Sequence, residues 1–248
     1  MPVYLWYNIV MAERQARGDV RAELIEAGVR LVDRDGPQAL NARKVATEIG
    51  ASTMAVYTHF GDMAALVDAI GDEAFARFAE ALNAVPRTDD PVADFFGIGV
   101  AYRKFALSNP QRYQLIFGVW SSDTSARSRA APTPTGETAD RTARTASFDV
   151  LLNAVRRMIE AGRIRDDEIL AIASRLWSLI HGVVMLELAG FLGHEGRALA
   201  EVLSPLVIDV LVGMGDGRDA ATHSIPTGSD RLPRSKARCE TKKTAAQG

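Results

Sequence analysis

The sequence predicts an all-α protein in two parts: a three-helix domain that contains a helix-turn-helix, and a larger helical domain after it. Three observations support this fold class. Apolar residues recur at helical spacing, no useful length of chain alternates between apolar and polar residues, and aromatic residues make up only 7%. A chain of 248 residues can bury a sizeable core in two modest domains.

The chain begins with a segment that we expect to be a flexible arm over residues 1–18, ahead of a helix that Asp19 caps. Its first ten residues are apolar but lack a basic start, a cleavage site and the roughly 20-residue length that crosses a membrane. We hypothesise that they are an upstream extension, because Met11 begins a polar run more typical of the start of such a domain. The first helix is expected to end near Asp33, before an Asp-Gly-Pro turn signal.

Two short helices are predicted to meet within residues 41–60, which read NARKVATEIGASTMAVYTHF. The first is expected over residues 42–49, with Asn41 as its N-cap. Gly50 suits the left-handed conformation that follows the last turn. Ser52 is expected to cap the second helix, which runs through the rest of the stretch.

The spacing within this stretch indicates a helix-turn-helix that reads the major groove of DNA. Ala46 lies four residues before Gly50, where the two helices cross most closely and a larger side chain would force them apart. Val45, Ile49 and Val56 supply the apolar contacts of the crossing, which leaves small and polar side chains of the second helix facing outward. The alternative is an ordinary helical hairpin within an all-α core.

The remaining elements follow from turn signals and apolar periodicity. The DNA-binding domain spans residues 19–84, and the second domain spans residues 90–213. Residues 121–144 hold almost nothing apolar beyond alanine and are expected to be a mobile loop, and residues 214–248 a disordered tail. The expected further helices run over residues 62–84, 91–107, 110–117, 145–161, 166–192 and 195–212.

The charge and the apolar content constrain the partners. The formal net charge of −2 argues against a generally basic nucleic-acid binder. It permits a local site, because the reading stretch contains two cationic residues, Arg43 and Lys44, and one acidic residue, Glu48. The last two predicted helices are more apolar than one small helical layer needs. A second copy of the chain would cover them best, as in a symmetric homodimer.

Residues 24–70 resemble the DNA-binding domain of the TetR (tetracycline repressor) family. The resemblance rests on the apolar face of the first helix, the segment VATEIGAS, and the run VYTHF that leads into a new helix. One departure is the run Gly61-Asp62-Met63, where family members usually carry a lysine that meets phosphate. Asp62 caps the helix well, but that phosphate contact is lost.

This resemblance and the geometry of the groove imply roles for the outward-facing residues. Met54 and Ala55 suit thymine methyl groups and the threonines suit hydrogen bonds, so the residues expected at base edges are Thr53, Met54, Ala55 and Thr58. The residues expected to hold phosphates are Arg43, Lys44, Ser52, Tyr57 and His59.

Residues 176–190, LWSLIHGVVMLELAG, together with NPQRYQLIF at residues 109–117, resemble the carboxy-terminal domain of a TetR subgroup marked by a Trp-x-x-x-His-Gly motif. The resemblance implies a largely apolar ligand cavity in which His181 and Tyr113 are the polar groups. The alternative is a filled core in which the imidazole finds a backbone partner. The implied lining residues are Phe105, Tyr113, Phe117, Trp120, Trp177, His181 and Met185.

No constellation of residues predicts catalysis, a metal site or a cofactor. There are four histidines, and His194-Glu195 opens like a zinc-protease motif, but Ala198 stands where the second imidazole should be. The single cysteine, Cys239, cannot form an internal disulfide, which suits a reducing cytoplasm.

The expected function is that of a homodimeric transcriptional regulator in the cytoplasm, most simply a repressor. Its affinity for a near-palindromic double-stranded DNA operator would fall when a small molecule binds the second domain. The helix over residues 62–84 touches both domains and would couple them. Two alternatives remain open: a DNA-binding dimer without an effector, and a helical enzyme that processes small molecules. No membrane partner is expected.

Overall fold

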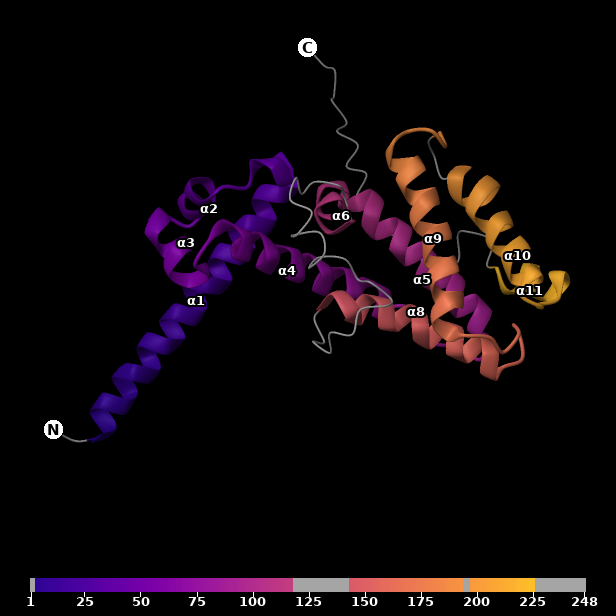
Figure 1. Ribbon diagram of the computed structural model, residues 1–248, viewed down its shortest axis with the longest axis horizontal. Helices are drawn as coiled ribbons and strands as arrows, with labels where there is room; N and C mark the ends of the chain where they lie inside the picture. The colour runs from indigo at the N-terminus through magenta and orange to yellow at the C-terminus, as the bar shows by residue number, and fades with distance from the viewer. Residues whose placement is uncertain (1–2, 118–142, 194–196, 226–248) are drawn as a thin grey trace, which may run out of the picture.

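The computed structural model describes residues 3–117, 143–193 and 197–225, which are helical with turns between the helices and contain no strand (Figure 1). The predicted all-α fold is therefore confirmed. The amino-terminal helices form one lobe, and α4 runs from it toward the second lobe, as Figure 1 shows.

Helix α1 spans Val3–Asp35, so the predicted arm over residues 1–18 is wrong for its described part, and Asp19 lies within a helix instead of capping one. A helix propagates until a residue stops it, and residues 3–17 contain neither proline nor glycine. The predicted end of the helix lies within two residues of the observed one. There Gly36, with φ of 84°, donates its N–H to the carbonyl of Val32 at 2.8 Å.

The rest of the first lobe consists of a 3-10 turn at Pro37–Ala39, α2 (Ala42–Glu48), α3 (Thr53–Phe60) and α4 (Met63–Asn83). Helix α1 reaches α4 closely at Gly28, where a Cβ would lie 2.2 Å from Cδ1 of Ile70. The helices share one core, whose members include Leu24, Ala27, Leu31, Val45, Ala46, Val56, Leu66 and Ile70.

The second lobe consists of α5 (Pro91–Ser108), α6 (Pro110–Phe117), α8 (Ala143–Glu160), α9 (Ile169–Leu188), η2 (Ala198–Leu203), α10 (Ser204–Gly213) and α11 (Arg218–Ser224). As predicted, Asp90 caps α5: its Oδ1 accepts from the backbone N–H groups of Val92 at 3.0 Å and Ala93 at 3.1 Å. Most of the predicted loop over residues 121–144 lies outside the described residues, although α8 already begins at Ala143.

Two predicted helix boundaries differ from the structure. Helix α9 begins at Ile169 instead of residue 166, because the chain before it is held against the end of α10, where the N–H of Arg165 donates to the carbonyl of Met214 at 2.9 Å. The helix predicted over residues 195–212 is a π-helical turn, η2, followed by α10. Pro205 lacks the N–H that an unbroken α-helix would donate to Glu201, and the turn before it is widened.

The start of the predicted disordered tail is folded. Ala221 of α11 is completely buried. The Arg163 guanidinium binds both carboxylate oxygens of Asp216 at 2.9 Å and Ser224 Oγ at 3.1 Å. Because a charged group distant in sequence holds this segment, apolar periodicity could not predict it. Residues 226–248 lie outside the described residues.

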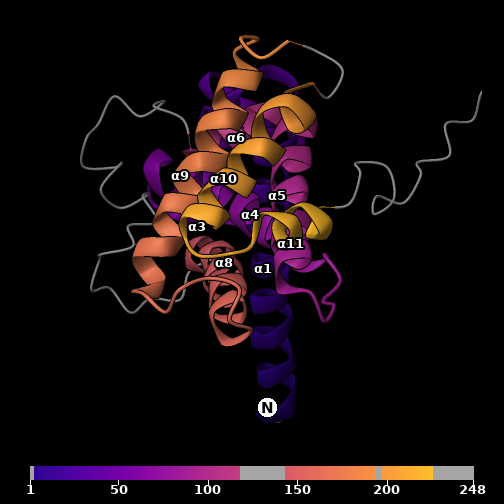
Figure 2. The ribbon, with the colours of Figure 1, turned by 90° about the vertical axis from the view of Figure 1, so that its right-hand side faces the viewer.

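Among the described helices, only α9 has the length and apolar composition that would allow it to cross a membrane. The same helix packs against α8, α5 and η2, as a core helix of a globular lobe does. Within α9, 28% of the apolar window is fully buried, most other residues are half-buried, and the exposed large apolar side chains are Met185 and Leu186. Figure 2 shows α9 and α10 side by side on one face of the second lobe.

Candidate DNA-reading surface and ligand cavity

The turn between α2 and α3 has the geometry that the sequence predicts. Asn41 Oδ1 accepts from the backbone N–H of Lys44 at 2.9 Å and caps α2. Gly50 has φ of 66°, in the left-handed region that favours glycine. Ala46 is buried at the crossing, and its carbonyl accepts from the N–H of Ala51 at 2.9 Å, so the turn is fixed by backbone hydrogen bonds.

Helix α3 is held firmly on its inner side. Val56 is completely buried and Phe60 packs against the core of the first lobe, with the guanidinium of Arg21 5.0 Å from the centre of its ring. Asp62 accepts from the N–H of Ala65 at 2.8 Å and so starts α4 directly after α3. Ser52 occupies the N-cap position of α3 as predicted, but its side chain makes no capping hydrogen bond.

The outer side of α3 is open to solvent. The Met54 side chain is 70% exposed and Tyr57 44%, both high for large apolar groups. Thr58 is exposed as well, and its hydroxyl donates to the carbonyl of Met54 at 2.9 Å. Ala55 and His59 are half-buried. The other residues predicted at DNA, all exposed, are Arg43, Lys44, Ser52 and Thr53.

The acidic groups beside this surface are paired. Arg34 of α1 donates to Glu48 at 2.9 Å and also binds Asp35. The hydrogen bond from Arg34 lowers the pKa of the Asp35 carboxyl, so this carboxyl stays ionised and paired. The exposed positive charges of Arg43 and Lys44 are therefore little offset by the acids of α2 and the end of α1.

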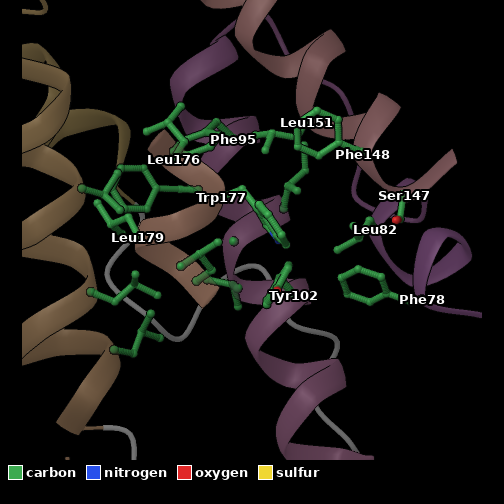
Figure 3. Close-up of a pocket in the computed structure, with 18 of the residues that line it drawn as sticks. Phe78, Leu82, Phe95, Tyr102, Ser147, Phe148, Leu151, Leu176, Trp177 and Leu179 are labelled. Carbon is green, nitrogen blue, oxygen red and sulfur yellow. The ribbon is translucent and has the colours of Figure 1, made fainter. Parts of the chain in front are cut away.

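A partly enclosed cavity of about 60 Å³ lies in the second lobe (Figure 3). A single water needs roughly 10–15 Å³ on the same measure, and an engineered apolar cavity that binds benzene has about 150 Å³, so this space is small. Its walls are almost entirely apolar side chains from α4, α5, α6, α8, α9, η2 and α10. They include Phe78, Leu82, Phe95, Phe96, Tyr102, Phe117, Phe148, Leu151, Trp177, Ile180, Leu199, Leu203 and Val207.

Two of the residues predicted to line a cavity do so, namely Phe117 and Trp177. Phe105 and Tyr113 are buried in an adjoining aromatic cluster, and His181 also lies behind the cavity wall. Met185 is 40% exposed and does not reach the cavity. The prediction treated one stripe of α9 as facing inward, but the helix turns Met185 outward while its neighbour Val184 is completely buried. Trp120 lies outside the described residues.

Sequence reasoning missed the walls that α8 and η2 supply. Phe148 and Leu151 were visible as part of an amphipathic helix, but periodicity does not say which helix they face. Tyr102 had no signal beyond its place on an apolar helix.

His181 belongs to a cluster of three polar groups. Its Nδ1 lies 2.7 Å from the Tyr113 hydroxyl and 3.0 Å from the Tyr102 hydroxyl, and the two hydroxyls are 2.9 Å apart. Burial raises the pKa of both tyrosines, so they remain protonated and can donate to the imidazole. Burial lowers the pKa of His181, which favours the neutral ring that accepts these hydrogen bonds. The polar partner that His181 finds is thus tyrosine, not the backbone.

Helix α4 connects the reading surface with the cavity. It begins at the Asp62 cap beside α3, and further along it Phe78 and Leu82 contribute to the cavity wall. A second connection runs through α6, where Arg112 Nε lies 2.6 Å from Asp33 Oδ1 of α1 and Arg112 Nη2 lies 2.5 Å from Oδ2. Movement of the cavity walls can therefore reach the first lobe along two helices.

Among the described residues, no group of three or more His, Cys, Asp or Glu side chains is arranged to hold a metal ion. In that part of the chain every buried side-chain nitrogen and oxygen also has a hydrogen-bond partner. The cavity walls formed by the described residues are almost entirely apolar.

Comparison with known proteins agrees with this arrangement. Residues 24–70 match the family model "Bacterial regulatory proteins, tetR family", and residues 95–210 match "Tetracyclin repressor-like, C-terminal domain". The HTH-type transcriptional regulator Rv1816 of Mycobacterium tuberculosis is 29% identical over 110 residues, which are 42% of this chain and 46% of that protein. The chain thus matches about half the length of this relative. An uncharacterised HTH-type regulator of the same organism, Rv0681, is 24% identical over 201 residues, or 78% of this chain and 81% of that one.

Solved structures share the fold. A protein of unknown function from Rhodococcus sp. RHA1 superposes with a TM-score of 0.62 at 25% identity, over 79% of this chain and 95% of that one. The structure of RolR in complex with resorcinol superposes with a TM-score of 0.58 at 16% identity, over 86% of this chain and 98% of that one. With both lobes matched to models of one family, the chain belongs to the tetR family of bacterial regulatory proteins and is a helix-turn-helix transcriptional regulator.

Proposed function

We propose that the protein is a homodimeric repressor that binds a near-palindromic DNA operator and leaves it when a small, largely apolar molecule enters the cavity of the second lobe. The observation that carries the proposal is the course of α4, whose first residues hold α3 in place and whose Phe78 and Leu82 line the cavity. A ligand that prefers one shape of the cavity then shifts α4 and the reading helix with it. The shift is limited by the difference in the ligand's affinity for the two shapes.

The uncovered apolar side chains support a homodimer. Leu186 and Phe191 at the end of α9 are 48% and 78% exposed, and Leu206 of α10 is 38% exposed. A surface of this kind on a regulator is best covered by an identical surface related by two-fold symmetry. Two reading helices related in this way meet successive major grooves about 34 Å apart, so the operator is an inverted repeat.

The apolar walls and modest volume of the cavity favour a small neutral ligand, no larger than one aromatic ring. RolR has a similar fold and binds resorcinol, a one-ring molecule with two hydroxyl groups. The walls described above are almost entirely apolar, which favours a less polar ring in this protein.

A DNA-binding dimer without an effector is the second candidate. It is favoured by the modest size of the cavity, about 60 Å³, and by the complete pairing of its polar neighbours. A cavity of this kind can also be a packing defect that no ligand uses.

The test starts from selection of binding sites by the full-length protein from a library of random duplex DNA. The expected result is enrichment of an inverted repeat, bound by a dimer in analytical ultracentrifugation. One-ring hydrocarbons (benzene, toluene and p-xylene) are then added at fixed salt, and the affinity for the selected site is expected to fall. If no sequence is enriched, specific DNA binding is refuted. If binding of the hydrocarbons leaves the affinity for the site unchanged, the effector-free dimer is the better description.

A further inference from the structure

The outward face of α3 has an unusual composition for a surface that reads DNA. Successive residues of a helix are about 100° apart, so Val56 and Phe60, which face the core, define an inward direction. Thr58 points directly away from it, with Met54 and Ala55 within about 60° on either side. Tyr57 and His59 lie on the flanks at about 100°, and Thr53 is further round at about 140°.

This central face presents no hydrogen-bond donor. Met54 ends in a thioether, Ala55 has only a methyl group, and the hydroxyl proton of Thr58 is already donated to the carbonyl of Met54. With its hydroxyl turned toward the helix backbone, Thr58 offers its methyl group to the groove. This differs from the role expected from the sequence, in which Thr58 would hydrogen-bond a base edge.

The major groove contains one feature that an apolar face can recognise. Guanine, cytosine and adenine present donors and acceptors there, whereas thymine adds a C5 methyl group. Side chains suited to paired hydrogen bonds with guanine or adenine, such as arginine, asparagine and glutamine, are absent from the eight residues of α3.

We infer that α3 selects its DNA half-site through the methyl groups of thymines, with Met54, Ala55 and Thr58 as the specificity-determining contacts. This inference rests on the proposed operator binding and names the chemistry that the operator must present. Phosphate contacts by Arg43 and Lys44 supply sequence-independent affinity, and the apolar face distinguishes sequences.

The first test replaces thymines of the selected site, one symmetric pair at a time, by deoxyuridine, which lacks only the C5 methyl group. Burial of one methyl group is worth about a fourfold change in affinity. A symmetric pair in the two half-sites should therefore weaken binding about 15-fold at contacted positions and leave it unchanged elsewhere. Fluorescence anisotropy with the full-length protein at fixed salt measures this ratio.

Two variants of Thr58 separate the methyl contact from a hydrogen bond. Thr58→Val keeps the methyl group and removes the hydroxyl, so discrimination between thymine and uracil should persist at the position that Thr58 contacts. Thr58→Ser keeps the hydroxyl and removes the methyl group, so the discrimination there should disappear. Met54→Ala should remove the discrimination at its own thymine, and the control Tyr57→Phe should leave every ratio unchanged, since Tyr57 lies on the flank of α3.

The outcomes are distinct from those for the proposed function. A site that is enriched but tolerates deoxyuridine at every position overturns the inference and leaves operator binding intact. A Ser variant that retains the discrimination between thymine and uracil also overturns the assignment to Thr58, because serine lacks the methyl group that would contact the thymine methyl. If no site is enriched, both the inference and the proposed operator binding are refuted. Circular dichroism and thermal unfolding confirm that these exposed substitutions leave the fold unchanged.

Discussion

Gly99 of α5 offers a direct way to fill the cavity and separate ligand response from DNA binding. It lies on the cavity wall, and a Cβ built at this position has no neighbouring atom within 4 Å. Its backbone is an ordinary helical one, without a positive φ that would require glycine. The substitution Gly99→Leu therefore places an apolar side chain into open space in an apolar environment.

The expected gain in stability has two parts. Replacing glycine in a helix interior by a good helix former stabilises by about 1 kcal/mol. Full burial of a leucine side chain stabilises by about 1.5–3 kcal/mol, and roughly half of that is expected in a partly enclosed cavity. The free energy of unfolding should rise by about 2–2.5 kcal/mol, which corresponds to about 4–10 °C in Tm for a chain of this size. Gly99→Ala is the matched control, since it gains the helix term and leaves most of the space open.

The assay combines thermal unfolding at one protein concentration with titration of the hydrocarbons and measurement of operator affinity. Concentration must be fixed because dimerisation contributes to stability. The hydrocarbons should raise Tm of the wild type and of Gly99→Ala but not of Gly99→Leu, whose operator affinity should no longer respond to them. A leucine variant that is less stable than the alanine variant, or that still responds to the hydrocarbons, would refute the reasoning about this cavity.

Three further predictions concern the connections between elements. Gly28→Ala should destabilise by about 1–3 kcal/mol, because its Cβ would lie 2.2 Å from Cδ1 and 2.7 Å from Cγ1 of Ile70. Ile70→Val removes Cδ1 but keeps a γ carbon, so it should relieve part of the clash and cost less stability in that variant than in the wild type. Urea unfolding that shows additive effects would contradict this. A double-mutant cycle with alanine at Arg112 and Asp33 should show a coupling free energy of about 1 kcal/mol. The value is modest because the Asp33 side chain is 35% exposed. The double replacement should also weaken the ligand-induced loss of operator affinity. Burial lowers the pKa of His181 from 6.5, so the stability it contributes is complete above pH 6.5 and is lost as pH falls through the lower folded-state pKa. His181→Gln should therefore flatten the pH dependence of Tm below pH 6.5. An unchanged slope would show that other groups cause this pH dependence.

The first lobe could be predicted closely because its signals are local. Asn41, Gly50 and Asp62 act through their own backbone conformation or through hydrogen bonds to residues three positions away. Such signals are readable in order along the chain, and each of these residues occupies the position that the sequence indicated. The exception is the start of α1, where a helix was predicted to begin at a capping residue although nothing in the preceding segment stops it.

The second lobe was predicted as helices but not as a cavity. Apolar periodicity identifies a helix that is buried, yet it does not say which of several neighbours each residue faces. His181 and Tyr113 were expected to line the cavity as its polar groups, but both lie behind its wall, where they pair with each other and with Tyr102 of the wall. That pairing depends on the crossing of α5, α6 and α9, which no local pattern encodes.

By itself, the sequence determined the helical class, the positions of the turns, and the identity of the twenty residues that form the reading unit, because caps, glycines and helical spacing act over a few residues. Only the tertiary structure decided which face of α3 is outermost and where an apolar space remains between α4, α5, α8 and α9. These features result from the packing of side chains that are distant in sequence, where burial and close contact are set jointly by all the helices that meet.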